Sequence, residues 1–444
     1  MKFFSHYPHI LLNIITRKIT NMLMPFLVKY KMISLLSTLL ELNLQKIKEI
    51  KPKNKIRYRV LVLTKSGGLD DLISIPKNAN KNILYLDCPR SFFKNLYFTI
   101  LEVKNKKEMY QKQNEKFKKQ YYDFLILLLK KLFKKNKYNA FIGFNFNYFA
   151  EKDLHAACTK LKIPFLLLYK EGVSTDIEKK YLKYSLEKSK SKFEGSKIAV
   201  YSNEQKKTFY KSNFFDQKKI EVVGCSRLNK SFYYKKQIPE NQILYYAIQV
   251  DRGLPNRFIR EYGNRFFKDL VGHKQYDQKY NWSLLHSKTL NILKRFAINH
   301  PETKVIIKTK IGTSKKMKQY FNLPKNIKIQ THGLGHDLLA KSKVVIGWNT
   351  TAILEAIAAN RFILLPYFNK KDKKLELSLK IKNQNYGFSE DDFYKKLCIF
   401  VKKKYKTNQI NNSLNSLNYY LGNKDNKAHL RLDRFIKKNI KMVL

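Results

Sequence analysis

Short apolar runs alternate with helical patterns along most of this chain, and this alternation limits the possible folds more than any other feature. Arg59–Thr64 (RVLVLT) and Ile163–Tyr169 (IPFLLLY) have the near-continuous apolar character of strands buried on both faces. Glu108–Phe133 and Glu151–Leu161 have the periodicity of helices. Strands of this kind, separated by helices, predict a parallel sheet covered on both sides. We therefore expect an α/β fold.

A polar stretch at 226–242 interrupts the alternation and is the best linker candidate. The alternation resumes at Ile243–Ile248 and continues through strands predicted at Lys304–Lys308, Ile327–Gln330 and Phe362–Pro366. A chain of 444 residues suits two or three domains. We expect two doubly wound, Rossmann-like domains facing across a cleft, with ligands at the carboxyl ends of their strands. The predicted division is an N-terminal segment at 1–55, a first domain at 56–225, the linker at 226–242, a second domain at 243–405 and a C-terminal helical segment at 406–444.

The formal net charge of +55 comes mainly from lysines spread over nearly every segment. Proteins that read nucleic acid usually concentrate arginine in one stripe, because its planar group makes bidentate contacts. The distribution here disfavours nucleic acid as a partner. A solvated basic surface and attraction to an anionic membrane surface remain as alternatives.

The N-terminal segment is apolar in pieces, at Ile10–Thr16, Met22–Val28 and Met32–Leu40. Basic residues interrupt it before any piece reaches the ~20 residues that span a bilayer, so we expect no transmembrane helix. The segment lacks a small-residue cleavage site, which disfavours a signal peptide. It is predicted to be basic and amphipathic, and either to lie on a membrane surface or to pack on the first domain. We expect a cytoplasmic protein, with peripheral attachment to the inner face of the cell membrane as an option.

The segment Lys343–Ala356 (KVVIGWNTTAILEA) contains the most informative group of candidate binding residues. Its strand ends at Gly347, which allows a tight turn, and Asn349, Thr350 and Thr351 follow where a helix begins. Polar side chains and unpaired N–H groups at a helix start form an anion site suited to a diphosphate. Glu355 lies one turn further on the same face, where a carboxylate accepts hydrogen bonds from a ribose. An ordinary capped helix with an exposed glutamate is the alternative.

This segment resembles the strand–turn–Ser/Thr–helix–Glu-Ala pattern in the C-terminal domain of GT-B glycosyltransferases. It is most similar to capsule and surface-polysaccharide transferases and to CDP-glycerol glycerophosphotransferases. The resemblance covers roughly Lys197 to the end of the chain. Four further pieces agree in order and spacing: Tyr201–Phe209 (YSNEQKKTF), Val222–Leu228 (VVGCSRL), Pro301–Lys310 (PETKVIIKTK) and Leu421–Ile436 (LGNKDNKAHLRLDRFI).

The resemblance implies an enzyme of the cell envelope that moves a sugar-type or glycerophosphate group from a nucleotide-activated donor. The second domain would bind the donor, and the first a glycan or lipid-linked acceptor. Lys310 stands where the family often has histidine, so Lys308 or Lys310 must supply the phosphate-binding cation. Asn426 replaces the usual glycine after Asp425. The alternatives are a nucleotide-sugar 2-epimerase on the same fold and a non-enzymatic basic protein that binds RNA or lipid.

Histidines and cysteines give no metal cluster. The four cysteines lie far apart, which fits a reducing compartment. His332 and His336 are separated by Gly333 and Gly335, which indicates a loop, and no third ligand is nearby. Two alternatives remain for these histidines: a contact with the base or phosphate of the nucleotide, or no role in binding. We expect no metal and no tightly bound cofactor, only the nucleotide-activated donor as substrate.

Three carboxylates and one arginine complete the candidates. Asp70 and Asp71 end the loop after the first strand, and Glu171 follows IPFLLLY. Transfer by inversion needs a general base near pH 7, and a carboxylate in a closed cleft serves as one. A structural role is the alternative for each. Arg252 follows the first strand of the second domain, where it would pair with an anionic group of the donor.

Overall fold

The computed structural model divides the chain into two compact units, each built on a parallel sheet. Unit 1 comprises Met1–Gly172, Ser189–Arg227 and Lys427–Leu444, and unit 2 comprises Val173–Lys188 and Leu228–Asn426. The described residues are 8–50, 52–65, 68–76, 82–103, 115–146, 149–173, 176–187, 192–212, 214–247, 282–309, 320, 322–331, 335–348, 350–368, 381, 385–406 and 414–440.

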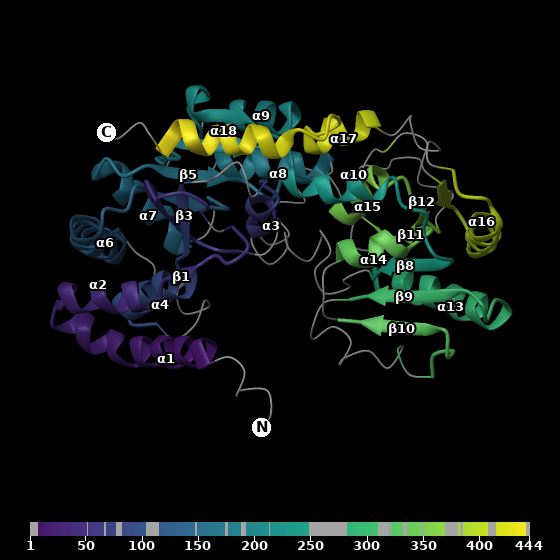
Figure 1. Ribbon diagram of the computed structural model, residues 1–444, viewed down its shortest axis with the longest axis horizontal. Coiled ribbons are helices and arrows are strands. Elements are labelled where there is room, and N and C mark those ends of the chain that lie inside the picture. The colour runs from purple at the N-terminus through teal and green to yellow at the C-terminus, as the bar shows by residue number, and fades with distance from the viewer. Residues whose placement is uncertain are drawn as a thin grey trace. The chain divides into compact units, whose positions relative to one another are not determined.

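Unit 1 has a seven-stranded sheet in the order β1-β3-β2-β4-β5-β6-β7 (Figure 1). All neighbours are parallel except β1, which runs antiparallel to β3 at the edge. The strands are β1 (Gln45–Lys46), β2 (Tyr58–Val62), β3 (Ile83–Asp87), β4 (Ala140–Gly143), β5 (Phe165–Leu168), β6 (Lys197–Val200) and β7 (Ile220–Val222).

Successive side chains of each strand point to opposite faces of this sheet, so apolar side chains lie on both faces, and helices cover both. Ala140 and Ile142 of β4 join a core cluster with Leu432 and Phe435 of the last helix, α18. Phe141 contacts Phe93 of α4, with ring centroids 6.4 Å apart. The helices of unit 1 are α1 (Pro8–Lys29), α2 (Ile33–Leu42), α3 (Gly68–Ile73), α4 (Arg90–Ile100), α6 (Glu115–Asn136), α7 (Phe149–Lys160), α9 (Asn203–Tyr210) and α18 (Ala428–Ile440), with the short helices η1 (Gln217–Lys219) and η2 (Ser226–Leu228) at its end.

Unit 2 has a six-stranded, fully parallel sheet in the order β10-β9-β8-β11-β12-β13. One face is buried under α13 and α16, which contribute Phe296 and Phe393 to the core. The strands are β8 (Gln242–Tyr246), β9 (Lys304–Lys308), β10 (Ile327–Gln330), β11 (Val344–Ile346), β12 (Phe362–Pro366) and β13 (Asn385–Gly387). The helices are α8 (Asp176–Glu187), α10 (Asn229–Tyr234), α13 (Trp282–Asn299), α14 (Gly335–Lys341), α15 (Thr351–Ala358), α16 (Glu390–Lys402) and α17 (Leu414–Leu421).

The strand order reverses direction once in each sheet. In unit 1 the parallel strands start at β2, with β3 added on one side and then β4 on the other. In unit 2 it starts at β8, adds β9 and β10 on one side and then β11 on the other. Loops at such a reversal leave in opposite directions and open a crevice at the carboxyl ends of the strands. The carboxyl ends of β2 and β4, and of β8 and β11, are therefore the places to look for a site.

The predicted α/β architecture with two doubly wound sheets is confirmed. The predicted strands Lys304–Lys308, Ile327–Gln330 and Phe362–Pro366 coincide with β9, β10 and β12. The linker candidate 226–242 contains η2 and α10. Two helices join a unit remote from them in sequence: α8 joins unit 2, and α18 joins unit 1.

Arg361, at the start of β12, is fully buried and holds several elements of unit 2 together. Its five N–H groups each donate to an oxygen, which satisfies the buried charge. The acceptors are the carbonyl oxygens of Leu339 (3.2 Å), Gln237 (3.1 Å), Tyr234 (3.1 Å) and Ala340 (2.9 Å), and the hydroxyl of Tyr405 (2.9 Å). The arginine thus joins α14 to the end of α10 and to the chain after α16.

Arg361→Met should lower the free energy of unfolding of unit 2 by at least about 3 kcal/mol, because it leaves buried carbonyl groups without donors. Both tryptophans, Trp282 and Trp348, belong to unit 2, so urea unfolding followed by their fluorescence reports on this unit. Arg295→Met is the control: its side chain is half exposed and pairs with Asp391 at 3.5 Å, so the loss should stay below about 1 kcal/mol. Equal losses in both variants would contradict the role of Arg361.

Candidate functional site

Four neighbouring strands of unit 1 deliver charged side chains to the carboxyl edge of the sheet. Lys65 follows β2, Arg90 follows β3, Glu151 follows β4 and Lys170 follows β5. The charges of Arg90, Lys170 and Glu151 all act on the Lys65 ammonium group, so the four side chains form one electrostatic cluster. We call Lys65, Arg90, Glu151 and Lys170 the unit 1 cluster. It lies where β2 and β4 meet, at the reversal of strand order.

Glu151 is the buried carboxylate of this cluster. It lies in the first turn of α7 and is 3% exposed. Oε1 accepts a hydrogen bond from Nε of Arg90, whereas Oε2 has no hydrogen-bond partner among the described residues. Burial raises the pKa of Glu151 to about 7, although the positive charges of Arg90 and Lys65 act to lower it. A carboxyl group with this pKa exchanges a proton readily near neutral pH.

The positive groups around Glu151 outnumber the negative ones. Burial lowers the pKa of Lys65, and the charges of Arg90 and Lys170 lower it further. Lys170 forms an ion pair of 2.7 Å with Glu171, whose side chain is half exposed. Three cations and two carboxylates, Glu151 and Glu171, thus share this edge of the sheet. Cations that converge in this way suit a substrate that carries a phosphate or carboxylate.

Asp71 is also buried but is fully engaged in the fold. One oxygen accepts hydrogen bonds from the Tyr201 hydroxyl (2.5 Å) and the Arg227 guanidinium (3.0 Å). The other accepts from the backbone N–H of Arg227 at 3.0 Å. These bonds join α3 to the ends of β6 and β7, which indicates a structural role. Asp70, the preceding residue of α3, is partly buried.

A second group of residues lies at the carboxyl edge of the unit 2 sheet. His336 of α14 is 8% exposed, and its Nδ1 lies 3.8 Å from a carboxylate oxygen of Glu355 on α15. That distance is too long for a hydrogen bond, and Nδ1 has no other partner among the described residues. Burial, followed by the Glu355 charge, raises the pKa of Tyr246 at the end of β8. We call His336, Glu355 and Tyr246 the unit 2 cluster; it flanks the reversal between β8 and β11.

The start of α15 lies beside this cluster. Thr350 is the N-cap residue, and its hydroxyl accepts from the N–H of Ala352 at 3.3 Å, while Thr351 is the first helical residue and is partly exposed. A Cβ atom at Gly347 would lie 3.0 Å from the Cδ1 atom of Ile353, so a larger residue would fit tightly there. Lys308 ends β9, and its ammonium donates to the Thr331 carbonyl oxygen at 3.0 Å.

Apart from Asp70 and Asp71, which lie in α3, the sequence-predicted residues fall into three groups. The structure brings Thr350, Thr351, Glu355 and His336 to one sheet edge and places Lys308 at the end of a neighbouring strand. It places Glu171 beside the unit 1 cluster. Four predicted residues lie outside the described part of the chain: Arg252, Lys310, His332 and Asn349.

Sequence reasoning missed Lys65, Arg90 and Glu151 as site residues. Lys65 directly follows the apolar run Arg59–Thr64, and Glu151 follows the run 138–146 after a short loop. These positions after predicted strands were the signal that could have identified both residues. Arg90 follows NILYLD in the same way. Nothing in the sequence indicates that Glu151 and Arg90, 61 residues apart, contact each other.

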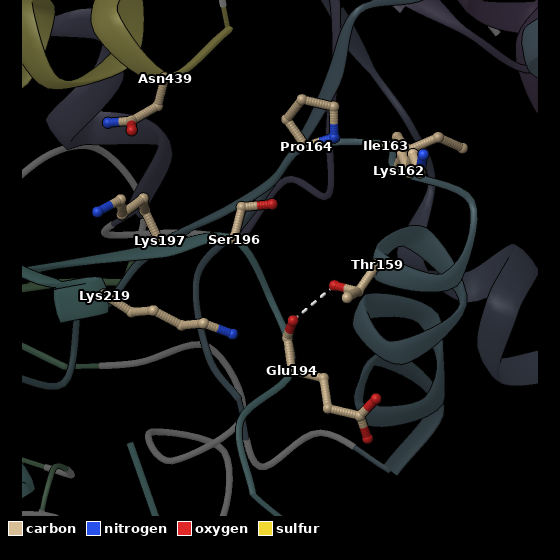
Figure 2. Close-up of a pocket in the computed structure, with 9 residues that line it drawn as sticks. All are labelled: Thr159, Lys162, Ile163, Pro164, Glu194, Ser196, Lys197, Lys219 and Asn439. Atoms are coloured by element: carbon tan, nitrogen blue, oxygen red, sulfur yellow. Dashed lines mark hydrogen bonds between the residues drawn. The ribbon is translucent and has the colours of Figure 1, made fainter. Parts of the chain in front are cut away.

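Figure 2 shows a pocket of about 190 Å³ at the opposite edge of the unit 1 sheet, where β5, β6 and β7 begin. The Thr159 hydroxyl donates to the Glu194 carbonyl oxygen at 2.5 Å, and the Lys197 ammonium donates to the Lys218 carbonyl oxygen at 2.7 Å. The Ser196 hydroxyl accepts from the backbone of β5 at 3.0 Å. These groups hold the sheet edge against α7. The lining residues are Thr159, Lys162, Ile163, Pro164, Glu194, Ser196, Lys197, Lys219 and Asn439.

Comparison with known proteins establishes the fold. No family model and no curated protein matches the sequence. A proposed UDP-N-acetylglucosamine 2-epimerase from Listeria monocytogenes has a TM-score of 0.50 and 10% identity, over 88% of this chain and 98% of that one. The UDP-GlcNAc 2-epimerase from Neisseria meningitidis bound to UDP-GlcNAc has a TM-score of 0.49 and 11% identity, over 86% of this chain and 100% of that one.

A third solved structure is the α,α-trehalose 6-phosphate synthase from Burkholderia multivorans, with a TM-score of 0.42 and 9% identity over 87% of this chain and 96% of that one. The fold is GT-B-like. Structural similarity at such low sequence identity shows a shared fold and does not show the activity, which has to be argued from the residues of the site.

Glu151→Gln should change how stability depends on pH. The pKa of Glu151 is about 7 in the folded state and near 4.5 when unfolded, so its ionisation destabilises the wild type as pH rises through this window. Glutamine mimics the protonated form. The variant should therefore match the wild type below pH 4.5 and exceed it by up to about 3 kcal/mol above pH 7.

Urea unfolding across this pH range, followed by far-UV circular dichroism, measures the difference, with tryptophan fluorescence as an internal reference for unit 2. Glu171→Gln is the control, because that side chain is half exposed and should give a small, pH-independent change. A Glu151→Gln variant that is less stable than the wild type at every pH would show that the carboxylate is ionised and paired throughout.

Proposed function

We propose that this protein is an enzyme that transfers a sugar-type group from a nucleotide-activated donor. The observation that carries the proposal is the position of the two clusters. Each lies at the carboxyl edge of a doubly wound sheet, at its reversal of strand order, where this architecture binds ligands. The chemistry differs between them: three cations with a proton-exchanging carboxylate in unit 1, and a buried His–Glu pair beside a helix start in unit 2.

Unit 2 is assigned to the donor. The diphosphate would lie at the start of α15, next to Thr351 and the positive end of the helix, with Lys308 as the cation. Glu355 and His336 would hold the ribose hydroxyls: the carboxylate accepts hydrogen bonds, and Nδ1 of His336 is available to accept or donate one. This arrangement supports the expectation taken from the sequence for Thr350, Thr351 and Glu355.

Unit 1 is assigned to the acceptor. Lys65, Arg90 and Lys170 would bind an anionic group of the acceptor, such as the phosphate of a lipid-linked glycan. Glu151 would take the proton from the acceptor hydroxyl. The oxygen then bonds to the transferred carbon, the bond from that carbon to the diphosphate oxygen breaks, and the diphosphate leaves with the electron pair. Glu171, paired with Lys170, is the second candidate for the base.

A 2-epimerase is the second candidate function, and one observation favours it. Glu151 and Glu171 both lie near Lys65 and Lys170, so two carboxylates share one edge. Inverting a carbon that carries hydrogen requires one group to remove the proton and another to return it on the opposite face. The Listeria structure, named for such an activity, has the same fold.

One experiment separates the two functions. The protein is incubated with UDP-N-acetylglucosamine in deuterium oxide, with and without a lipid-linked acceptor, and the products are followed by NMR. A transferase releases UDP in an acceptor-dependent reaction and leaves hydrogen at carbon 2. An epimerase incorporates deuterium at carbon 2 without an acceptor. Glu151→Gln should lower either rate by at least about a hundredfold. If UDP-, GDP- and CDP-linked sugars neither bind nor react, the proposal fails.

The assignment of Glu355 to the ribose has its own test. Glu355→Gln should raise the dissociation constant for a ribonucleotide donor by tenfold or more, and much less for the 2′-deoxy donor, because a charge-assisted hydrogen bond contributes roughly 1.5–3 kcal/mol. Isothermal titration of both proteins against both donors gives the coupling as a double-mutant cycle. Asp337→Asn, in the first turn of the same helix as His336, is the control and should show no coupling. A coupling near zero for Glu355 would remove it from the site.

A further inference from the structure

Helix α1 exposes a continuous apolar stripe on the surface of unit 1. Its members follow the helical spacing i, i+4, i+7 and i+11, so they lie on one face. Their exposed fractions are large for apolar side chains: Ile15 43%, Ile19 42%, Met22 72% and Phe26 54%. Four more apolar residues of this segment are exposed: Tyr30 and Met32 after the helix, and Leu35 and Leu42 of α2. We call these eight residues the apolar stripe. Contiguous exposed surface of this kind marks an interaction site.

The opposite face of α1 is docked on unit 1. Met24 and Leu27 are buried, and the buried Thr20 accepts a hydrogen bond from the Asn43 side chain at 2.8 Å. Asn95 of α4 donates to the side chain of Asn21 at 2.8 Å, and Arg17 lies 3.5 Å from Asp87 at the end of β3. Figure 1 shows α1 and α2 lying side by side, next to α4. The stripe is therefore displayed by a helix already packed in place.

The charged residues of α1 and of the turn after it are all basic. Residues 1–40 contain Lys2, Arg17, Lys18, Lys29 and Lys31 and no aspartate or glutamate. Lys18, Lys29 and Lys31 are exposed, and Lys18 and Lys29 lie on the helix face next to the stripe. A second copy of this surface would bring like charges together, which opposes self-association. An anionic bilayer offers apolar acyl chains to the stripe and negative headgroups to the lysines.

We propose that the apolar stripe docks unit 1 on an anionic membrane surface, with α1 lying in the plane of the headgroups. Phe26 and Tyr30 would sit at the boundary between headgroups and acyl chains, where aromatic rings are favoured, and Lys18, Lys29 and Lys31 would contact lipid phosphates. Within the described part of the chain, no helix combines the length and apolar character that crossing a bilayer requires. Binding is therefore interfacial. This proposal concerns a surface and does not depend on the proposed enzymatic function.

The test is co-sedimentation of the full-length protein with vesicles. One set is phosphatidylcholine alone, and the other contains one third phosphatidylglycerol. The wild type should bind the anionic vesicles, and Met22→Asp with Phe26→Asp should reduce the partition coefficient by about tenfold or more, since both changes place charge in the interface. The matched control is Ile298→Asp with Ile399→Asp, two apolar residues of unit 2 that are 68% and 59% exposed, and it should bind as the wild type does.

A neutral pair, Met22→Gln with Phe26→Gln, covers the case in which the double aspartate variant fails to fold, and it should also bind several-fold more weakly. Lys18→Gln with Lys29→Gln should remove most of the preference for anionic vesicles and leave the weak binding to phosphatidylcholine. Wild-type binding that is equal for both vesicle types, or unchanged in the Met22 and Phe26 variants, would overturn the proposal. So would a dimer in sedimentation velocity that the Met22 and Phe26 variants abolish, because the stripe would then be a contact between copies.

Discussion

Apart from the edge strand β1, both sheets are parallel and covered by helices on both faces, and this burial decides where charged side chains can lie. Strands such as Val60–Val62 and Val344–Ile346 carry apolar side chains towards both layers, which leaves no solvated face. A charged group in the middle of such a sheet would lose its hydration without compensation. Most charged side chains therefore lie near the strand ends or on edge strands. At the carboxyl ends, the loops after β2, β3, β4 and β5 supply Lys65, Arg90, Glu151 and Lys170 to a single edge.

Two buried carboxylates in unit 1 show how the same side chain chemistry serves different purposes. Asp71 accepts hydrogen bonds on both oxygens, from Tyr201 and Arg227, and so stabilises the ends of β6 and β7. Glu151 is equally buried, yet only Oε1 is bonded among the described residues, and burial raises its pKa to about 7. A carboxylate that is hydrogen-bonded on both oxygens serves to hold the fold, whereas a buried carboxylate with one unbonded oxygen and a raised pKa is ready to exchange a proton. This contrast is the reason to place Glu151, rather than Asp71, in the reaction.

Much of the fold follows from local pattern. The strands of unit 2 were predictable to the residue at β9, β10 and β12, because a short apolar run bounded by polar residues has few other interpretations. The donor-side residues Thr350, Thr351 and Glu355 were equally accessible, since a helix start after a buried strand is a local feature. The residues assigned to the acceptor side could not be predicted in this way. Glu151 contacts Arg90 across 61 residues, and no periodicity or spacing encodes a contact of that kind.

The sequence by itself determined the alternation of buried strands and helices, and with it two parallel sheets and the helix start at Thr351. It also determined the absence of acidic residues from the first 40 positions. Only the tertiary structure decided which face of α1 is packed and which is exposed, because Met24 and Phe26 are both apolar and differ only in what lies against them. It likewise decided the proton affinity of Glu151. Desolvation depends on every group packed around a side chain, and those groups come from segments far apart in the chain.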